Sequence, residues 1–454
     1  MHILVATTPS VRGRVGGGQT YVAREIEALQ ARGHRVSVIT EDERPSAGAE
    51  WRHEEAVGFG HPGTTGVAHA DDSDVWMERN RGRARRTADA IRSLKPDVIH
   101  ANGMKALLVI AAARLGVPCV VTIHHPGIVC PIGTMTRPDR SRCRRVPGDR
   151  TCASCYCRQR RWGRHLGGWL GAIPESLSSS LSEFLAPLPG AAFLSRALRY
   201  PRDVRHALQE RRMLHREAGH WIAPSRAALA LLQANGVAAD RIHLVPHGIV
   251  PLARTPILDR GPLRFGYVGE WSLAKGLDLL LSAFSSGPSA LGCELHVFGA
   301  APATPEGQAF AATVRRRTPA GVRLHGPFHA GAIESAYATF DVLVVPGTFL
   351  EIFGLVVLEA MSAGRPVIAS RCGGPEDSIR DGIDGLLVPR GNSGALAASM
   401  MRLATAPAEV RRLAGNLRPV RTMDEHAADL ERVFGVALRA DRSRGSGAGG
   451  VSGS

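Results

Sequence analysis

The hydrophobic positions of this chain follow two alternating patterns. Short apolar runs alternate with stretches in which apolar residues recur every three or four positions, as Val22, Ile26 and Leu29 do. In the first half the runs predict strands at His2–Thr7, Val36–Thr40, Val98–His100, Cys119–Ile123, Trp221–Ala223 and Ile242–Pro246. Helices are predicted at Lys105–Leu115 and Pro224–Ala234, the second capped by Ser225. This strand–helix–strand order predicts a parallel sheet with helices on both faces.

The same alternation returns after a Pro-rich stretch at 249–262, which we interpret as a linker. It predicts strands at Arg264–Val268, Glu294–Phe298, Val342–Val345 and Pro366–Ser370, and helices at Leu277–Phe284, Gly331–Thr339, Gly354–Ala363 and Ala395–Leu403. We therefore predict an α/β protein with two doubly wound, Rossmann-like domains, 1–248 and 263–416, facing each other across a cleft.

The end of the chain is expected to be helical and then disordered. Residues 407–438 have a helical pattern, and we expect the part at 417–440 to pack back on the N-terminal domain. The Gly- and Ser-rich end, 441–454, is expected to be a disordered tail. Residues 41–80 have too weak a pattern to assign.

Length and charge narrow the class of protein. A chain of 454 residues with 44% hydrophobic content is long enough for two folded domains. No apolar run reaches membrane-spanning length and no signal peptide is apparent, so we expect a cytoplasmic protein. The net charge is +15, and 17 arginines against 6 acidic residues lie between 137 and 216. Such a region attracts anionic membranes, nucleic acids or diphosphates, although a solvated face is an equally good interpretation.

The stretch 346–389, PGTFLEIFGLVVLEAMSAGRPVIASRCGGPEDSIRDGIDGLLVP, holds the strongest candidate chemistry. Glu351 lies in a loop after a buried strand, a Phe353-Gly354 turn opens a helix, and Glu359 follows in that helix. The N-terminus of a helix has free N–H groups and a positive dipole end, which suit a diphosphate. A carboxylate there can accept hydrogen bonds from ribose hydroxyls.

Two further motifs indicate phosphate and substrate contacts. Lys275 starts a predicted helix in the run VGEWSLAKGL, where its ammonium can bind a diphosphate. A glycine loop, Gly16, Gly17 and Gly18, precedes the first helix. His124 ends the strand VTIHH, and His100 and Asn102, which are weaker candidates, end another strand. Residues at the carboxyl ends of such strands line the cleft.

These motifs together resemble family-4 glycosyltransferases, which have the GT-B fold and retain anomeric configuration. The resemblance implies that Glu351 contacts the donor sugar, that Glu359 binds the ribose, and that Phe353, Gly354 and Leu355 contact the phosphates. It further implies that Gly16, Gly17 and Lys275 bind the nucleotide sugar and that His124 is a substrate-side contact or catalytic helper. On this resemblance the expected catalytic residues are His124, Glu351 and Lys275. Glu270 stands where the family usually has an arginine. Pro246-His247-Gly248 resembles the family's Pro-Asn-Gly turn and is interpreted as a hinge.

The resemblance also sets the expected partners. They are a UDP- or GDP-type sugar donor and an acceptor glycan or lipid-linked saccharide, as in cell-envelope or exopolysaccharide synthesis. No catalytic cofactor is expected, because no D-x-D metal motif directly precedes the cleft residues. A GT-B-fold epimerase or phosphorylase and a weakened homologue stay open as alternatives. A nucleic-acid-binding protein would show finger repeats or aromatic platforms, so nucleic acid is not an expected partner.

An insertion at about 128–160 contains a cluster of cysteines. Cys130, Cys143, Cys152 and Cys155 have the spacing C-x12-C-x8-C-x2-C, with Cys157 as an extra thiol. Four thiolates suit a structural zinc, which we rank ahead of free thiols or a redox pair. Next to it, Trp162, Leu166, Trp169 and Leu170 lie among arginines. This patch can contact an anionic membrane or pack on the N-terminal domain.

Overall fold

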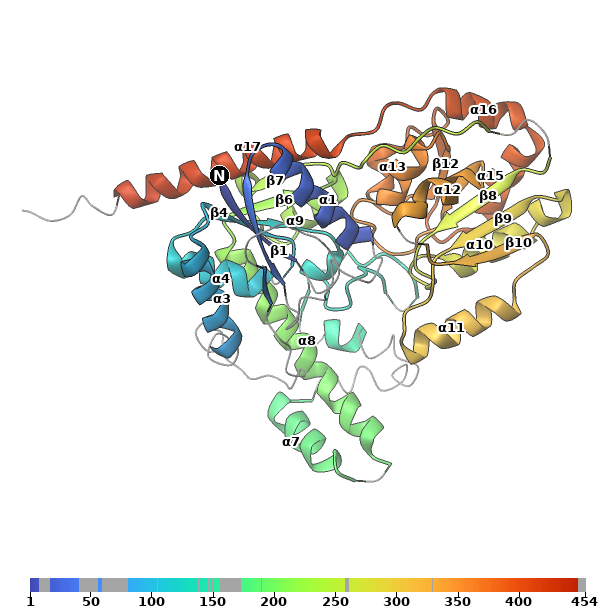
Figure 1. Ribbon diagram of the computed structural model, residues 1–454. Coiled ribbons are helices and arrows are strands. Elements are labelled where there is room, and N and C mark those ends of the chain that lie inside the picture. Colours follow the sequence, from blue (N-terminus) through green and yellow to red (C-terminus); the bar gives the residue numbers. More distant parts are fainter. Residues whose placement is uncertain are drawn as a thin grey trace, which may run out of the picture.

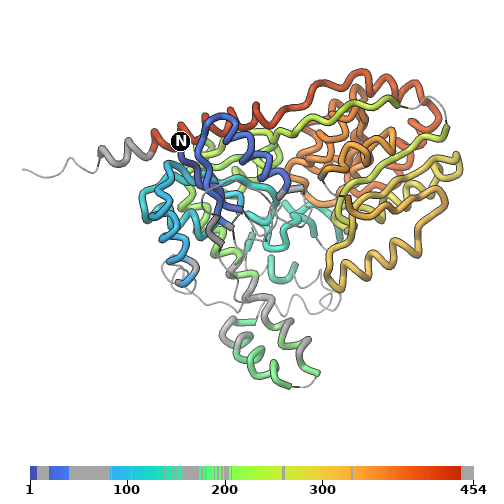
Figure 2. The backbone as a smooth tube through the Cα atoms, viewed as in Figure 1, coloured from blue at the N-terminus to red at the C-terminus, as the bar shows by residue number. Residues whose placement is uncertain are grey.

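The computed structural model describes residues 1–7, 17–40, 56–58, 81–103, 105–137, 139–144, 147–148, 151–155, 173–188, 190–257, 261–328 and 330–447. These residues form two α/β units, each built around a parallel sheet (Figure 1). The chain passes through the N-terminal unit first, and its C-terminal helix returns along that unit (Figure 2).

The N-terminal sheet has seven strands in the order β3-β2-β1-β4-β5-β6-β7. The strands are β1 (His2–Thr7), β2 (Arg35–Thr40), β3 (Ala56–Gly58), β4 (Val98–Ala101), β5 (Cys119–Thr122), β6 (His220–Ala223) and β7 (Ile242–Leu244). Its helices are α1 (Gly17–Ala31), α3 (Arg81–Leu94), α4 (Lys105–Leu115), α7 (Glu175–Leu185), α8 (Ala192–Glu217) and α9 (Arg226–Gln233), with 3-10 turns η1 (Pro126–Ile128) and η2 (Ala239–Arg241). All paired strands are parallel, as the buried apolar runs predict.

The C-terminal sheet has six strands in the order β10-β9-β8-β11-β12-β13. The strands are β8 (Arg264–Val268), β9 (Glu294–Phe298), β10 (Val322–Gly326), β11 (Val342–Val345), β12 (Val367–Ser370) and β13 (Gly385–Val388). Its helices are α10 (Leu277–Ser285), α11 (Pro305–Arg316), α12 (Ile333–Ala338), α13 (Leu355–Ser362), α14 (Pro375–Ser378), α15 (Ser393–Thr405) and α16 (Pro407–Gly415), with 3-10 turns η3 (Pro288–Leu291) and η4 (Ala330–Ala332). In both sheets the strand order reverses direction, which is where doubly wound folds bind ligands.

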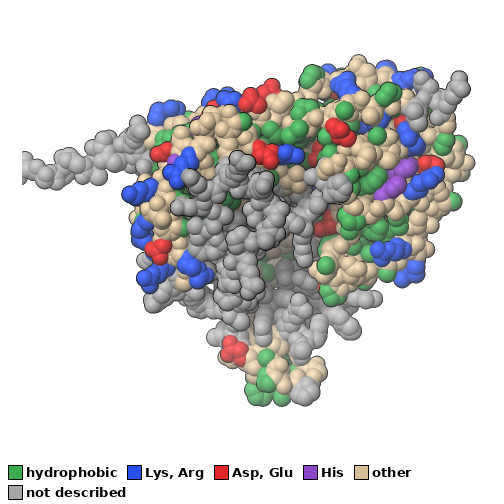
Figure 3. Space-filling view, viewed as in Figure 1, with side chains coloured by type: hydrophobic (Ala, Val, Ile, Leu, Met, Phe, Trp, Pro, Cys, Tyr) green, Lys and Arg blue, Asp and Glu red, His purple; other side chains and the backbone are tan. Residues whose placement is uncertain are grey.

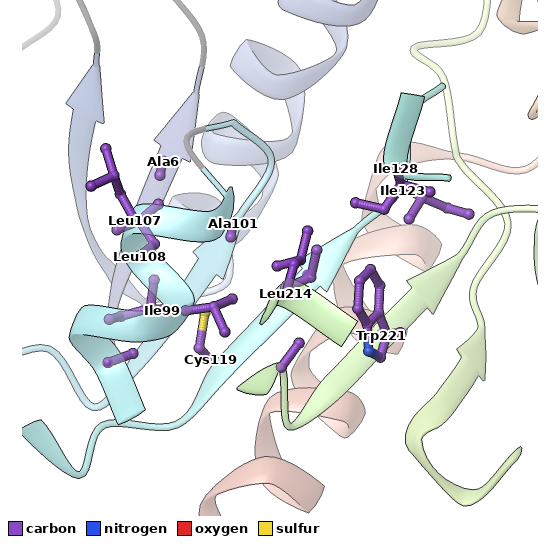
Figure 4. Packing of buried hydrophobic residues seen from close by; sticks show 14 of the residues in the cluster. Ala6, Ile99, Ala101, Leu107, Leu108, Cys119, Ile123, Ile128, Leu214 and Trp221 are labelled. Atoms are coloured by element: carbon purple, nitrogen blue, oxygen red, sulfur yellow. The ribbon is translucent and has the colours of Figure 1, made fainter. Parts of the chain in front are cut away.

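The N-terminal core lies between the sheet and the helices on both of its faces. On one face, Leu107 and Leu108 of α4, Leu214 of α8 and Trp221 of β6 pack together (Figure 4). On the opposite face, α1 packs with the long C-terminal helix α17 (Met423–Gly447). Leu430 and Phe434 of α17 are fully buried there.

The helical prediction for 407–438 and the disordered tail predicted for 441–454 need correction. The helix is interrupted between α16 and α17, where Pro419 lacks the N–H that a continuing helix requires. The segment before α17 instead pairs with the linker, since Ile249 forms a parallel bridge with Thr422. Beyond that break, α17 extends to Gly447, into the predicted tail.

The chain passes between the two units twice, in the linker after Gly248 and in the segment before α17, and these two segments lie side by side. A Cβ atom at Gly248 would lie 2.0 Å from the carbonyl oxygen of Thr422, so only glycine allows this approach. The structure thus explains the glycine of the predicted hinge. None of the described helices is long and apolar enough to cross a membrane.

Candidate active site

Two loops meet at the point where the strand order of the C-terminal sheet reverses. One follows β8 and ends at Lys275 and Gly276, and the other follows β11. The Thr348 N–H donates to the carbonyl oxygen of Ala274 at 2.8 Å. Gly276 has a φ of +77°, and a Cβ atom there would lie 2.0 Å from the carbonyl oxygen of Pro346. This close approach brings Lys275 to the loop that carries Glu351.

Lys275 and Glu351 form an ion pair between these two loops. Lys275 Nζ donates to Glu351 Oε2 at 2.8 Å. Leu350 and Ile352, on either side of Glu351, pack into the N-terminal core, so the carboxylate between them points away from that core. Burial acts to lower the pKa of Lys275, but the charge and hydrogen bond of Glu351 hold it above its ordinary value. The ammonium is therefore charged at neutral pH and retains donors for an anion.

The helix that follows this loop places the second glutamate. Gly354 is the N-cap of α13, and Leu355 is its first residue. Glu359 Oε2 accepts a hydrogen bond from the Tyr337 hydroxyl at 2.6 Å, and burial raises the pKa of Glu359. Among the described residues no hydrogen-bond donor contacts the other carboxylate oxygen, which remains available to a ligand hydroxyl.

His124 is the candidate site residue that the N-terminal sheet contributes. It follows β5, and its Nε2 lies 2.6 Å from Asn102 Oδ1. Asn102 Nδ2 in turn donates to Glu25 Oε1 at 3.0 Å. Since the amide oxygen of Asn102 can only accept, His124 Nε2 must donate, which leaves Nδ1 with a lone pair. Burial lowers the pKa of His124 well below its ordinary value, and Lys105 lowers it further.

We therefore expect His124 to be neutral, with the proton on Nε2, from about pH 6 to pH 8. Nitrogen NMR of protein labelled with ¹⁵N-histidine measures this directly, with His124→Phe to assign the signals. Replacing Asn102 by leucine removes the acceptor, so both tautomers should then appear. A wild-type His124 ring protonated on both nitrogens at about pH 7 would contradict this reading.

A buried polar network supports this histidine, and the sequence analysis did not identify it. Glu25 is fully buried and lies 3.0 Å from His100 Nδ1 and 3.5 Å from His426 Nε2. The hydroxyl of Tyr21 hydrogen-bonds His426, and His426 Nδ1 lies 2.9 Å from the carbonyl oxygen of Pro246. A sequence signal did exist, because Glu25 lies on the apolar stripe formed by Val22, Ile26 and Leu29.

Aromatic rings connect the N-terminal histidine to the C-terminal loop. The His124 ring stacks on His247 at 5.4 Å, and His247 contacts Phe353 at 4.8 Å. Tyr21 of α1 packs on His247 at 4.1 Å. His247 therefore lies between the two units, and Phe353 is buried against it. His124 and Phe353 are thus linked through His247, and Phe353 lies two residues after Glu351 in the chain.

Some predicted residues lie outside the described part of the chain. Gly16 is one of them, as are Trp162, Leu166, Trp169 and Leu170, whereas Gly17 is the first residue of α1. Glu270, at the family's arginine position, adds negative charge near Lys275 and supports its raised pKa. The structure therefore places an acid, not a second cation, beside the lysine.

The cysteine cluster is present as four free thiols. Cys130 is buried, and Cys143, Cys152 and Cys155 are half-buried. Burial and, to a smaller extent, the other three thiols raise the pKa of Cys155 to about 11, so these three thiols lie within electrostatic range of Cys155. Among the described residues, however, no three or more His, Cys, Asp or Glu side chains are grouped as metal ligands. The structural zinc stays a prediction.

Comparison with protein families gives one match in each unit. The model described as Glycosyltransferase Family 4 matches residues 15–157. The model described as Glycosyl transferases group 1 matches residues 262–406. The second range contains Lys275, Glu351 and Glu359, and the first contains His124.

Curated relatives match shorter stretches. A D-inositol 3-phosphate glycosyltransferase of Xylanimonas cellulosilytica is 31% identical over 46% of this chain and 54% of its own. A GDP-mannose-dependent alpha-mannosyltransferase of Mycobacterium tuberculosis is 33% identical over 42% of this chain and 49% of its own. The matches thus span about half the length of these two relatives or less.

Solved structures match nearly the whole fold. HepE of Anabaena, in complex with UDP and glucose, has a TM-score of 0.64 and 17% identity, covering 96% of this chain and 100% of its own. Sucrose-phosphate synthase of Thermosynechococcus elongatus has a TM-score of 0.66 and 19% identity, covering 97% and 100%. At these identities the likeness shows the fold alone.

Proposed function

Because the chain belongs to the family-4, group 1 glycosyltransferases and has their GT-B fold, we propose that it transfers a hexose-type sugar from a nucleoside diphosphate to a hydroxyl acceptor, with retention of anomeric configuration. The observation that carries the proposal is the Lys275–Glu351 pair, whose members lie in the loops that precede α10 and α13. It unites a cation for a diphosphate with a carboxylate for sugar hydroxyls.

The donor is proposed to be a UDP- or GDP-type sugar. The curated mannosyltransferase relative is named for its dependence on GDP-mannose, and the structural neighbour HepE holds UDP and glucose. The acceptor is proposed to be a glycan or lipid-linked saccharide of the cell envelope or an exopolysaccharide. The enzyme is proposed to act in the cytoplasm, at the inner membrane face when the acceptor is lipid-linked.

The residues suggest how the reaction proceeds. Lys275 donates to the departing diphosphate, whose developing charge the N-terminal end of α13 also stabilises. Glu351 accepts hydrogen bonds from the donor sugar, and Glu359 accepts them from the ribose. The acceptor hydroxyl attacks C1 on the face from which the diphosphate leaves: the bond from C1 to the diphosphate oxygen breaks, the new C1–O bond forms, and the hydroxyl proton passes to the departing diphosphate oxygen. The Nδ1 lone pair of His124 accepts a hydrogen bond from a substrate hydroxyl beside the reacting carbon.

Nucleotide binding tests the proposal without knowledge of the acceptor. Thermal-shift screening with UDP, GDP and ADP should raise the unfolding temperature with the base that fits. Replacing Glu359 by glutamine should lower the affinity for that nucleoside diphosphate about tenfold, as expected when a hydrogen bond to a charged group is lost. The 2′,3′-dideoxy analogue, which lacks the ribose hydroxyls, should bind wild type and variant equally.

Two outcomes would count against the proposal. One is full donor affinity and turnover in the double variant Glu351→Ala/Glu359→Ala. The other is that Glu359→Gln lowers the affinity for the dideoxy analogue as much as the affinity for the nucleoside diphosphate. That result would show a general disturbance of α13 instead of the loss of a ribose contact. Product analysis with free acceptors then separates transfer from epimerisation or phosphorolysis, and proton NMR of the new glycosidic bond reports retention.

A further inference from the structure

The helical hairpin of α7 and α8 has its apolar side chains on the outside. Leu177, Leu181 and Phe184 form one stripe along α7, and they are 53%, 38% and 70% exposed. Leu188 and Leu194, in the turn and at the start of α8, continue this surface at 44% and 48% exposure. We call these five residues the α7 face. Of the eleven large apolar side chains that are exposed among the described residues, these five lie within 177–194.

The inside of the hairpin is polar. Ser178 and Ser182 of α7 and Ser195 of α8 are buried where the two helices meet. Ser195 Oγ donates to the carbonyl oxygen of Ser182 at 2.8 Å, and Ser182 Oγ donates to the carbonyl oxygen of Ser195 at 3.0 Å. An amphipathic helix in water normally has the reverse arrangement, with its apolar stripe against a neighbour and its serines toward solvent.

Small hydroxyl residues between helices, with leucine and phenylalanine outside, suit apolar surroundings. In lipid, helices are held together by close packing and by hydrogen bonds between small side chains, since apolar side chains gain nothing by facing each other. A large, contiguous apolar surface on a soluble domain also marks an interaction site. We therefore expect the α7 face to contact a partner or a lipid surface.

Within the part of the chain that the structure describes, the placement of the hairpin leaves that face exposed. The far half of α8 is anchored in the N-terminal core by Met213 and Leu214, whereas α7 and the start of α8 project from the body of the molecule (Figure 1). Apolar side chains are visible on this projection in the space-filling view (Figure 3). The projection thus presents the α7 face at its end, on a fixed stem.

The positive charge around the hairpin indicates which kind of surface the α7 face contacts. The sequence from 137 to 216, which contains the hairpin, has 17 arginines against 6 acidic residues. A basic segment that flanks an apolar helix face is attracted to anionic headgroups while the apolar side chains enter the acyl boundary. We propose that the α7 face inserts into the surface of an anionic lipid bilayer and so holds the enzyme at the membrane. This proposal rests on the hairpin and not on the sugar chemistry.

Vesicle binding tests it. Full-length protein is sedimented with vesicles of equal parts phosphatidylglycerol and phosphatidylcholine, and with phosphatidylcholine vesicles alone. Wild type should bind the anionic vesicles, and the triple variant Leu181→Ser/Phe184→Ser/Leu188→Ser should bind them at least about tenfold less. The matched control is Leu244→Ser/Val250→Ser/Leu291→Ser, which removes three similarly exposed apolar side chains from elsewhere. It should bind like wild type.

Two further measurements keep the test decisive. Nucleotide thermal shifts of the triple serine variant should equal those of wild type, which shows that the variant is folded and that the site is intact. Sedimentation velocity then reports whether the α7 face joins two copies of the chain. The proposal would be overturned if wild type failed to bind the anionic vesicles, or if the triple variant bound them as well as wild type does. It would also be overturned if the triple substitution changed a dimer to a monomer without changing vesicle binding.

Discussion

Replacing Lys275 by methionine should lower kcat by about 10²–10³-fold, the effect of removing one preorganised charge from a leaving group. The lysine is the cation that contacts the loop of Glu351, with 2.8 Å between Nζ and Oε2. Glu270 adds negative charge near it, where the family usually has an arginine. The loss of Lys275 is therefore not compensated from that position. Single-turnover rates at saturating donor measure the effect on the chemical step.

The control for this variant is Arg323→Met. Arg323 lies on β10 of the same unit, is paired with Glu294 and has a side chain that is 61% exposed, so its loss also removes one paired cation. We expect wild-type rates from it. Lys275→Arg should recover part of the rate, because the charge is kept while its shape changes. A Lys275→Met enzyme that binds donor and keeps at least half of the wild-type kcat would refute the role of Lys275.

Replacing Glu25 by leucine should destabilise the protein by about 3–5 kcal/mol, the usual cost of removing one partner from a buried charged group. Glu25 is fully buried, and its carboxylate is the shared acceptor for Asn102 and His100. Although burial opposes ionisation, His100 and His426 hold the pKa of Glu25 well below its ordinary value. A leucine leaves these donors buried without an acceptor. Urea unfolding followed by circular dichroism measures the loss.

A second residue of the same helix serves as the control. Glu27 is 46% exposed and pairs with Arg24 on the surface. Surface ion pairs contribute little, so Glu27→Leu should change stability by less than about 1 kcal/mol. Glu25→Gln, which keeps one acceptor oxygen, should fall between the two. If Glu25→Leu proved as stable as Glu27→Leu, the network would not be a structural element of the N-terminal unit.

The role of Lys275 could be predicted from the sequence to a greater degree than the role of Glu25. Lys275 and Glu351 belong to contiguous motifs, in which each residue follows a buried strand and precedes a helix. Parallel strands bring their carboxyl ends to one edge, so these local patterns are enough to predict that the two residues meet. The two parallel sheets were predictable from equally local patterns, because short buried apolar runs alternate with helical stretches along the chain.

The tertiary structure alone decided the surroundings of His124 and the orientation of α7. Tyr21 and His426 are 405 positions apart, and no local period encodes that contact. In the sequence, Glu25 is recognisable only as a charged residue on an apolar stripe. Its partners, His100 of β4 and His426 of α17, are known only from the structure. The spacing of Leu177, Leu181 and Phe184 predicts a helix but not the side it turns to solvent, because periodicity fixes which residues share a face and only packing fixes what that face meets.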